Sequence, residues 1–307
     1  VRIIFLGSPE IALPCLQALV PSGEQVLAVV SQPDRPAGRG QQLTPPPVAQ
    51  YANEKKIPLL QPEKIGEIFE SLQSLKPDLM VVVAYGQYIP KKILALPSGG
   101  CLNIHFSLLP QYRGAAPIHW VLINNEEKTG VTSMKVTEKM DAGPIYLQQE
   151  VPIRPEDNVT ILGQRLANKG AELLLETIDG LKRGALSPYE QEESESCWAP
   201  LLKKEMGQID WTRPAKVLAS LIRGTNPWPG AYTFIDRKRF KIYSAEAVVA
   251  KGKQLPGTVL ETGPKGIQVA CGQGALLLRE VQIEGGRPLM SEEFLKGHPL
   301  ETGTQFS

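Results

Sequence analysis

A chain of 307 residues is long enough for one large domain and a smaller one. With 42% hydrophobic and 21% charged residues, its composition is that of an ordinary globular protein and excludes an intrinsically disordered chain. The net charge of +1 argues against nucleic-acid binding spread over the whole surface, although the C-terminal third is more basic than the rest.

The sequence does not predict membrane insertion, export or metal binding. No run approaches the roughly 20 apolar residues that span a bilayer. The first residues, VRIIFLG, are typical of a strand and not of a signal peptide. We therefore expect a cytoplasmic, monomeric protein without a membrane partner. The four cysteines lie far apart and only three histidines are present, which argues against a zinc site.

The N-terminal part alternates short apolar runs with amphipathic segments, which is typical of a doubly wound, mostly parallel Rossmann-like α/β sheet. We expect strands over residues 2–6, 26–31, 58–60, 78–84 and 101–107, and helices over residues 10–19, 48–56 and 64–76. Dinucleotide-binding domains carry Gly-x-Gly-x-x-Gly in the first turn, where this chain has only Gly7. A nicotinamide or flavin enzyme is therefore not expected.

Residues 32–48 form a long, punctuated connection between the second strand and the second helix. They include Arg35, Arg39 and three consecutive prolines. Connections in compact domains usually span only about 4–6 residues, and longer ones often carry function. The length alone does not distinguish a functional loop from a surface insertion.

The strand at 78–84 reads DLMVVVA, a continuous apolar run typical of a parallel strand that is buried on both faces. Tyr85 and Gly86 follow it. At the carboxyl end of a central strand, backbone amides of such a turn can meet a flat heterocycle, although core packing explains the valines equally well.

A stretch from Cys101 to Trp120 places three polar side chains at alternate positions of a strand, Asn103, His105 and Ser107. They should project to one face, because successive side chains of a strand alternate. Pro117 is well placed to begin the next helix. A lone histidine beside an apolar run is more often structural, so the motif and not His105 alone carries the functional interpretation.

Another strand is expected at 129–136, and the turn after it holds Asp141. An aspartate in such a place can simply stabilise the turn, or it can act in catalysis. A further strand at 148–153 and a long amphipathic helix at 158–181 follow. We expect the catalytic domain to span residues 1–183, a linker to span 184–210 and a second domain to span 211–307.

The last hundred residues show a short helix after Pro214 and then five short strands, at 231–235, 239–247, 257–261, 266–270 and 275–280. Such a pattern predicts a small OB-like β-barrel. Its first hairpin carries Arg237, Lys238, Arg239 and Lys241, interleaved with Phe240 and Tyr243. This hairpin can be an RNA-facing patch or an ordinary exposed hairpin with core aromatics.

The string Asn-x-His-x-Ser-Leu-Leu-Pro, followed by Tyr-Arg-Gly-Ala-Ala-Pro, resembles the signature of the folate-dependent formyltransferases. Its Arg-Gly-Ala-Ala-Pro-Ile ending is most similar to the branch of that family that formylates initiator methionyl-tRNA in translation initiation. The resemblance implies Asn103, His105 and Asp141 as catalytic residues, and 10-formyltetrahydrofolate as the formyl donor. It places the donor against Tyr85, Gly86 and the run Ser107, Leu108, Leu109 and Pro110.

The same resemblance assigns the 32–48 loop to the acceptor arm of the tRNA, with Arg39 matching the arginine of that loop and Arg35 beside it. We expect the basic hairpin Arg237, Lys238, Arg239 and Lys241 to be the second tRNA contact. Two other functions stay open: a formyltransferase for 4-amino-sugar nucleotides, and a non-catalytic RNA-binding module.

Two positions depart from the family pattern. Gln41 and Gln42 stand where relatives commonly have lysines, which predicts fewer phosphate contacts. Phe106 stands where the family usually has a small residue. Strand alternation points its ring away from the site, so we expect a small core residue beside it.

Overall fold

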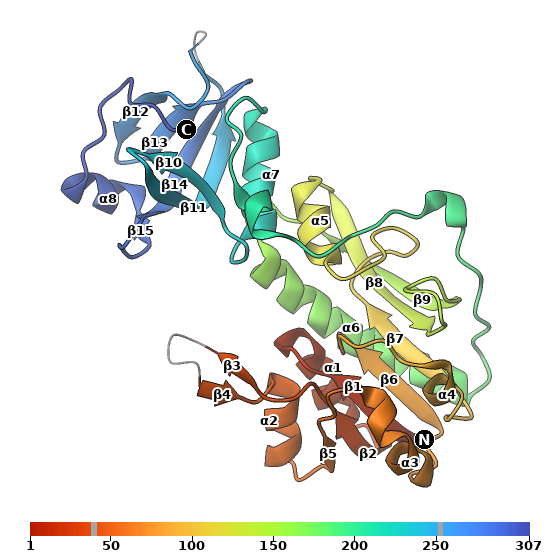
Figure 1. Cartoon of the computed structure of the whole chain (residues 1–307). Coiled ribbons are helices and arrows are strands. Elements are labelled where there is room, and N and C mark those ends of the chain that lie inside the picture. Colours follow the sequence, from red (N-terminus) through yellow and green to blue (C-terminus); the bar gives the residue numbers. More distant parts are fainter. Residues whose placement is uncertain (38–41, 251–253) are drawn as a thin grey trace. The chain divides into compact units, whose positions relative to one another are not determined.

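The computed structural model describes residues 1–37, 42–250 and 254–307 of the chain (Figure 1). It contains two compact units. The first comprises residues 1–117, 128–152 and 163–199, and the second comprises residues 118–127, 153–162 and 200–307. The domain boundaries expected from the sequence stay a prediction.

The first unit is built on a seven-stranded sheet in the order β5-β2-β1-β6-β7-β8-β9. The strands from β5 to β7 are parallel, and β8 and β9 are antiparallel to their neighbours. Their bounds are β1 Arg2–Gly7, β2 Gln25–Val30, β5 Leu59–Leu60, β6 Leu79–Val83, β7 Cys101–His105, β8 Lys128–Lys135 and β9 Ile145–Pro152. The chain order reverses between β1 and β6, and ligands of doubly wound sheets bind at the carboxyl ends beside such a reversal.

Helices cover both faces of this sheet. They are α1 Leu13–Leu19, α2 Pro47–Glu54, α3 Phe69–Ser74, α4 Lys91–Leu94 and α6 Val159–Lys182, with 3-10 turns at Glu10–Ala12 and Ile65–Ile68. One face of β1 and β6 packs on α3 and α4 through Leu72 and Ile93. All five residues of β6 are buried, as its unbroken apolar run predicted.

Phe106 points into the core on the side of α6. A Cβ at Gly170 of α6 would lie 3.3 Å from the Phe106 ring and 2.9 Å from Ile104 Cγ2. The helix can pack against these strand residues because position 170 has no side chain. The expectation of a small residue beside Phe106 is thus confirmed.

The 32–48 connection, for which the sequence predicted no strand, contains secondary structure. It contains a short antiparallel hairpin, β3 Arg35–Ala37 and β4 Gln42–Thr44, whose last pair joins Ala37 and Gln42. The helix α5 begins at Pro117, as predicted, and ends at Ile123. The strand expected at 148–153 starts earlier, at Ile145.

The second unit is centred on an antiparallel sheet in the order β10-β11-β14-β13-β12, with β15 paired to β14. Its elements are α7 Ala215–Thr225, β10 Ala231–Ile235, β11 Lys238–Val248, β12 Val259–Gly263, β13 Gly266–Ala270, β14 Ala275–Ile283, β15 Leu289–Met290 and α8 Ser291–Gly297. Phe240 of β11 packs edge-on against Phe294 and at a tilt against Phe306 at the centre of the core, and α7 packs on β11. The strand β15 and the helix α8 were not predicted.

The two sheets confirm the expected fold class, a mostly parallel Rossmann-like sheet followed by a separate antiparallel β unit. Among the residues that the structure describes, no helix is both long enough and apolar enough to cross a bilayer.

Candidate active site

His105 is the last residue of β7, and its ring is almost completely buried. Its Nε2 lies 3.0 Å from the backbone oxygen of Tyr112. A carbonyl oxygen can only accept a hydrogen bond, so Nε2 carries a proton. The second ring nitrogen, Nδ1, is therefore the one that faces the rest of the site.

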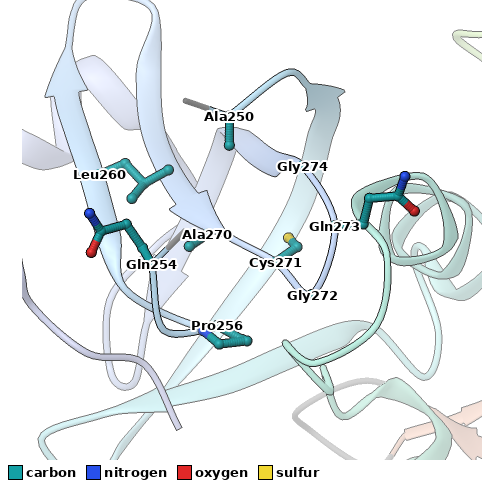
Figure 2. Close-up of a pocket in the computed structure, with 9 residues that line it drawn as sticks. All are labelled: Ala250, Gln254, Pro256, Leu260, Ala270, Cys271, Gly272, Gln273 and Gly274. Carbon is teal, nitrogen blue, oxygen red and sulfur yellow. The ribbon is translucent and has the colours of Figure 1, made fainter. Parts of the chain in front are cut away.

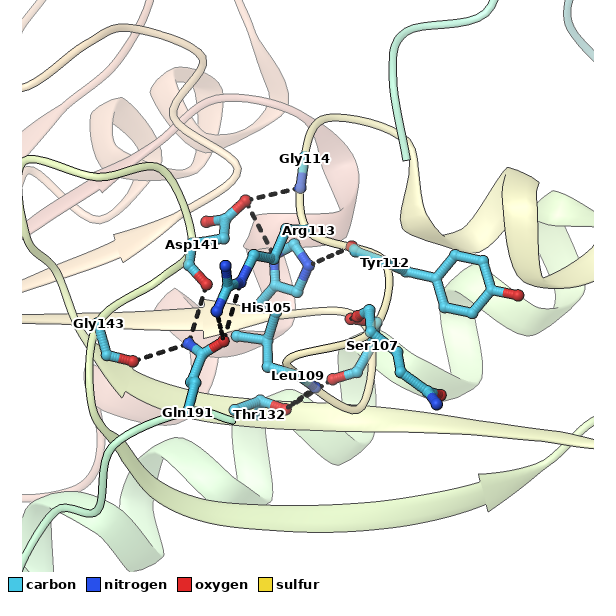
Figure 3. Close-up of polar contacts among 11 residues, drawn as sticks. His105, Ser107, Leu109, Tyr112, Arg113, Gly114, Thr132, Asp141, Gly143 and Gln191 are labelled. Atoms are coloured by element: carbon cyan, nitrogen blue, oxygen red, sulfur yellow. Dashed lines mark hydrogen bonds and ion pairs between the residues drawn. The ribbon is translucent and has the colours of Figure 1, made fainter. Parts of the chain in front are cut away.

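Asp141 faces that second nitrogen. Its Oδ2 lies 3.8 Å from Nδ1 of His105, with side-chain exposures of 18% for Asp141 and 7% for His105 (Figure 3). The same oxygen accepts the N–H of Gly114 at 2.9 Å. A carboxylate held this close to the ring can accept a proton from a neighbouring donor.

Gly114 is required by its surroundings. Its φ is +119°, a backbone conformation that disfavours a side chain, and a Cβ there would lie 2.8 Å from the backbone oxygen of Ala199. The close approach brings the 112–116 loop against residues 197–199, where the Arg113 N–H donates to the Cys197 oxygen and the Arg113 oxygen accepts the Ala199 N–H. It also aims the Gly114 N–H at Asp141.

Asn103 lies two residues before His105 on the same strand, so both side chains project to one face of the sheet. Its side chain is partly exposed, whereas Leu102 and Ile104 on the opposite face are buried. Two of the three predicted catalytic residues thus share a strand face, and Asp141 joins them from the loop between β8 and β9.

The predicted folate-side run, residues 107–110, forms a fixed turn after β7. Ser107 is fully buried and its hydroxyl donates to the backbone oxygen of Gln111 at 2.7 Å. Thr132 of β8 joins the turn at both ends: its hydroxyl donates to the Ser107 oxygen at 2.6 Å and accepts the Leu109 N–H at 3.2 Å. The amide of Gln148 donates to the Leu109 oxygen at 2.8 Å.

Leu108 and Pro110 complete that turn. Leu108 packs over Gly130 of β8, where a Cβ would lie 2.5 Å from the Leu108 side chain. Pro110 follows a cis peptide bond with Leu109 and is partly exposed. The hydroxyl of Ser107 is already engaged within the turn, so the turn offers a ligand mainly its apolar and backbone surface.

Tyr85 and Gly86 lie at the carboxyl end of β6, as expected, but the ring of Tyr85 packs in the core. Burial raises the pKa of Tyr85 to about 12, so its hydroxyl stays neutral. The Tyr85 carbonyl accepts hydrogen bonds from Ser8 and from Gln32, which follow β1 and β2. At the reversal of strand order, the turn of Tyr85 and Gly86 therefore presents backbone groups and no side chain. Gly86 has a φ of +81°.

A buried arginine, Arg113, is linked to the loop that carries Asp141. Arg113 is 3% exposed and makes hydrogen bonds to Gln191 and Glu193. The amide of Gln191 in turn donates to the backbone oxygens of Asp141 and Gly143 (Figure 3). No sequence pattern pointed to Gln191, because it stands in an acidic, irregular segment 50 residues from Asp141.

The predicted tRNA contacts in the N-terminal unit are only partly described. Arg39 lies outside the described residues. Arg35 is in β3, is well exposed, and forms an ion pair with Glu63 at 2.8 Å. A nucleic-acid phosphate would therefore compete with Glu63 for the Arg35 guanidinium.

The predicted basic hairpin is present as β10 and β11. Arg237 is in the turn at φ +63°, Lys238 is exposed, and Lys241 is partly exposed. The guanidinium of Arg239 stacks 3.6 Å from the centre of the Tyr232 ring. A cation held flat on an aromatic ring is a frequent component of surfaces that bind single-stranded nucleic acid.

Phe240 is a core aromatic, which is one of the two alternatives that the sequence left open for this hairpin. Its side chain is fully buried in the core of the C-terminal unit. Strand alternation puts Phe240 on the opposite face from Arg239 and Lys241. The aromatic partner on the basic face is Tyr232 of the neighbouring strand, which the sequence interpretation missed.

Two cavities in the C-terminal unit contain none of the predicted site residues. One, of about 370 Å³, is lined largely by backbone and small side chains around Cys271 (Figure 2). Burial raises the pKa of the Cys271 thiol to about 11, which leaves it neutral and unreactive. The other, of about 420 Å³, is lined by Arg154, Lys216 and Arg223 together with several acidic residues. Among the described residues, no cluster of three His, Cys, Asp or Glu side chains could hold a metal ion.

Comparison with known proteins gives this geometry a family. The family model described as formyl transferase matches residues 1–178, and that of the formyl transferase C-terminal domain matches residues 201–299. The chain is 48% identical to methionyl-tRNA formyltransferase of Trichlorobacter lovleyi over 99% of this chain and 96% of that protein. It is also 48% identical to methionyl-tRNA formyltransferase of Geobacter sulfurreducens, again over 99% and 96% of the two chains.

The chain belongs to the methionyl-tRNA formyltransferase family. Its fold is that of the formyltransferases, as comparison with a solved structure shows. The solved structure is the crystal structure of WlaRD, a sugar 3N-formyl transferase, in the presence of dTDP and 5-N-formyl-THF. That structure superimposes with a TM-score of 0.68 at 18% identity, over 94% of this chain and 99% of that one. In this member of the family, the carboxyl end of β7 meets the loop after β8, and Asn103, His105 and Asp141 lie there.

Proposed function

We propose that this chain transfers a formyl group from 10-formyltetrahydrofolate to the amino group of initiator methionyl-tRNA for translation initiation. The observation that carries the proposal is the 48% identity to methionyl-tRNA formyltransferases over nearly the whole length of both chains. The spacing of His105 and Asp141 at a sheet edge supports it, because this reaction needs acid–base groups within hydrogen-bond reach of the reacting atoms.

The chemistry defines what the site must do. The neutral amine of the methionyl group attacks the formyl carbon, and the carbonyl electrons move onto oxygen to give a tetrahedral adduct. When the adduct collapses, the bond from carbon to N10 of the folate breaks and the new amide remains. The amine nitrogen loses one proton and N10 gains one, so the reaction as a whole moves a proton from one nitrogen to the other.

In our proposal Asn103 and His105 stabilise the oxygen of the adduct, and Asp141 supports His105 and accepts the proton of the attacking nitrogen. Loss of one such oxyanion contact typically costs about 10²- to 10³-fold in rate. The proton at Nε2 of His105 is engaged by the Tyr112 carbonyl. His105 can therefore donate to the oxygen of the adduct only through a proton at Nδ1, beside Asp141.

For the formyl donor, we propose a site formed by the turn at residues 107–110 and the backbone of Tyr85 and Gly86. The hydrogen bonds from Thr132 and Gln148 support this assignment, because they fix the turn before any substrate binds.

For the tRNA, we propose contacts through Arg35 and Arg39 in one unit, and through Arg237, Lys238, Arg239 and Lys241 in the other. Residues 1–183 would carry the chemistry, residues 184–210 would link the domains, and residues 211–307 would bind tRNA. The salt dependence of binding should be shallower than in family members that have lysines in place of Gln41 and Gln42. We further propose that the enzyme acts as a monomer in the cytoplasm, where translation begins.

The proposal is tested by mixing the enzyme with 10-formyltetrahydrofolate and one of three acceptors: initiator methionyl-tRNA, a 4-amino-sugar nucleotide or glycinamide ribonucleotide. Product formation is measured by mass spectrometry. We expect N-formylmethionyl-tRNA alone. Formylation of the sugar nucleotide alone would reject the substrate assignment, and tRNA binding without any transfer would favour a binding module.

A further inference from the structure

The amide of Gln191 links its own segment to two loops that are distant in sequence, the loop of Arg113 and the loop of Asp141 and Gly143. Its Nε2 donates to the backbone oxygen of Asp141 at 2.9 Å and to that of Gly143 at 2.7 Å (Figure 3). Both protons of the amide group are used, and both acceptors are in the loop that carries the catalytic carboxylate.

Arg113 fixes the orientation of that amide. The Gln191 Oε1 accepts two N–H groups from Arg113, from Nε at 3.0 Å and from Nη2 at 2.9 Å. The guanidinium has no acceptor atom, so it can pair only with the oxygen end of the amide. The nitrogen end must then face Asp141 and Gly143. Glu193 holds the remaining side of the guanidinium through Nη1.

The Asp141 loop depends on such support. Asp141 itself is in the left-handed region at φ +49°, which is strained for a residue with a side chain. Gly143 lies so close to β8 that a Cβ would meet the backbone oxygen of Lys135 at 1.9 Å. The ladder between β8 and β9 begins only after this loop, at Ile145. Gln191 thus supplies partners to two carbonyls that are outside the ladder.

We propose that Gln191 is a positioning residue of the formyl-transfer reaction. Oriented by Arg113, the Gln191 amide sets the place of the Asp141 carboxylate relative to His105. This inference rests on the proposed function. The 3.8 Å between Asp141 Oδ2 and His105 Nδ1 is sensitive to a small movement of the loop, and a displacement of about 1 Å can cost on the order of 10²-fold in rate.

The sharpest variant is Gln191→Glu. It keeps the shape of the side chain and keeps an acceptor for Arg113, but it replaces both donors with an oxygen that repels the two carbonyls. We expect kcat to fall on the order of 10²-fold, with little change in KM for either substrate. Gln191→Met removes the same donors without adding charge and is the second variant if the glutamate does not fold. Gln164→Glu, on the exposed face of α6, is the matched control and should behave as wild type.

A double-mutant cycle separates positioning from a general structural role. If Gln191 acts through the carboxylate of Asp141, combining Gln191→Glu with Asp141→Asn should give the same kcat as Asp141→Asn alone. An unchanged kcat in Gln191→Glu, or a further loss in the double variant equal to that of the single, would overturn the inference. If the wild-type enzyme formylates only an amino-sugar nucleotide, the substrate assignment fails and the same cycle is measured with that acceptor.

Discussion

Replacing Asp141 with asparagine removes one negative charge while keeping an oxygen that can accept the Gly114 N–H. In the wild-type enzyme the Asp141 carboxylate lies 3.8 Å from His105 Nδ1, and both side chains are more than four-fifths buried. Opposite charges at that separation attract by about 4 kcal/mol at an effective dielectric constant of about 20. A difference of about 1.4 kcal/mol is tenfold in rate. The full attraction therefore corresponds to roughly 10³-fold.

We accordingly expect Asp141→Asn to lower kcat by about 10²- to 10³-fold, because the positive charge on His105 or on the attacking nitrogen loses its counter-charge. The assay is single-turnover formyl transfer with enzyme in excess over initiator methionyl-tRNA, which isolates the chemical step. The control is Asp179→Asn. It breaks an exposed ion pair between Asp179, near the end of α6, and Arg183, just after that helix. A folded Asp141→Asn enzyme that keeps its rate within tenfold of wild type would refute this use of the charge.

Three further outcomes follow from the structure. At pH 8, a thiol reagent should modify Cys197 first, because it is exposed while the other three cysteines are buried with raised pKa values. Its sulfur accepts the Tyr112 N–H, so modification should slow transfer in wild type but not in Cys197→Ser. Burial lowers the pKa of His119, so the folded state binds fewer protons there than the unfolded state. The stability that results is present above a pH of about 6.5 and is lost on acidification. Denaturation at pH 5 and pH 7.5 should show a smaller acid loss for His119→Asn. Gly170→Ala should lower the free energy of unfolding by about 1–2 kcal/mol, because crowding against Ile104 and Phe106 outweighs the helix propensity gained. Urea titration measures this change, and adding Phe106→Leu should restore the part that comes from Phe106.

Periodicity and chain punctuation predicted the elements that build the site. The apolar run of β6 and the proline that begins α5 both behave as local physical chemistry requires, and the alternation of β7 puts Asn103 and His105 on one face. The meeting of His105 with Asp141 was expected only from the resemblance to known formyltransferases. No spacing rule connects the end of one strand with a loop more than 30 residues later.

The rest of the site could not be predicted from local patterns. Gln191 reaches Asp141 from an irregular segment, and Thr132 reaches Ser107 from the neighbouring strand β8. Such contacts depend on tertiary packing, which hydrophobic periodicity does not encode. For Phe240, strand alternation already favours the core alternative over the RNA-facing one, because it puts Phe240 on the opposite face from Arg239. The strands β3, β4 and β15 are each two or three residues long and are too short to show a periodic pattern.

The most direct measurement of the central claim is single-turnover transfer by an Asn103→Ala/His105→Ala enzyme to initiator methionyl-tRNA, compared with wild type and with Arg39→Ala. We predict that the double variant binds the tRNA normally but forms almost no N-formylmethionyl-tRNA, whereas Arg39→Ala keeps a near-normal chemical step and needs more tRNA to reach it. A double variant that transfers the formyl group at the wild-type rate would contradict the assignment of catalysis to this strand face.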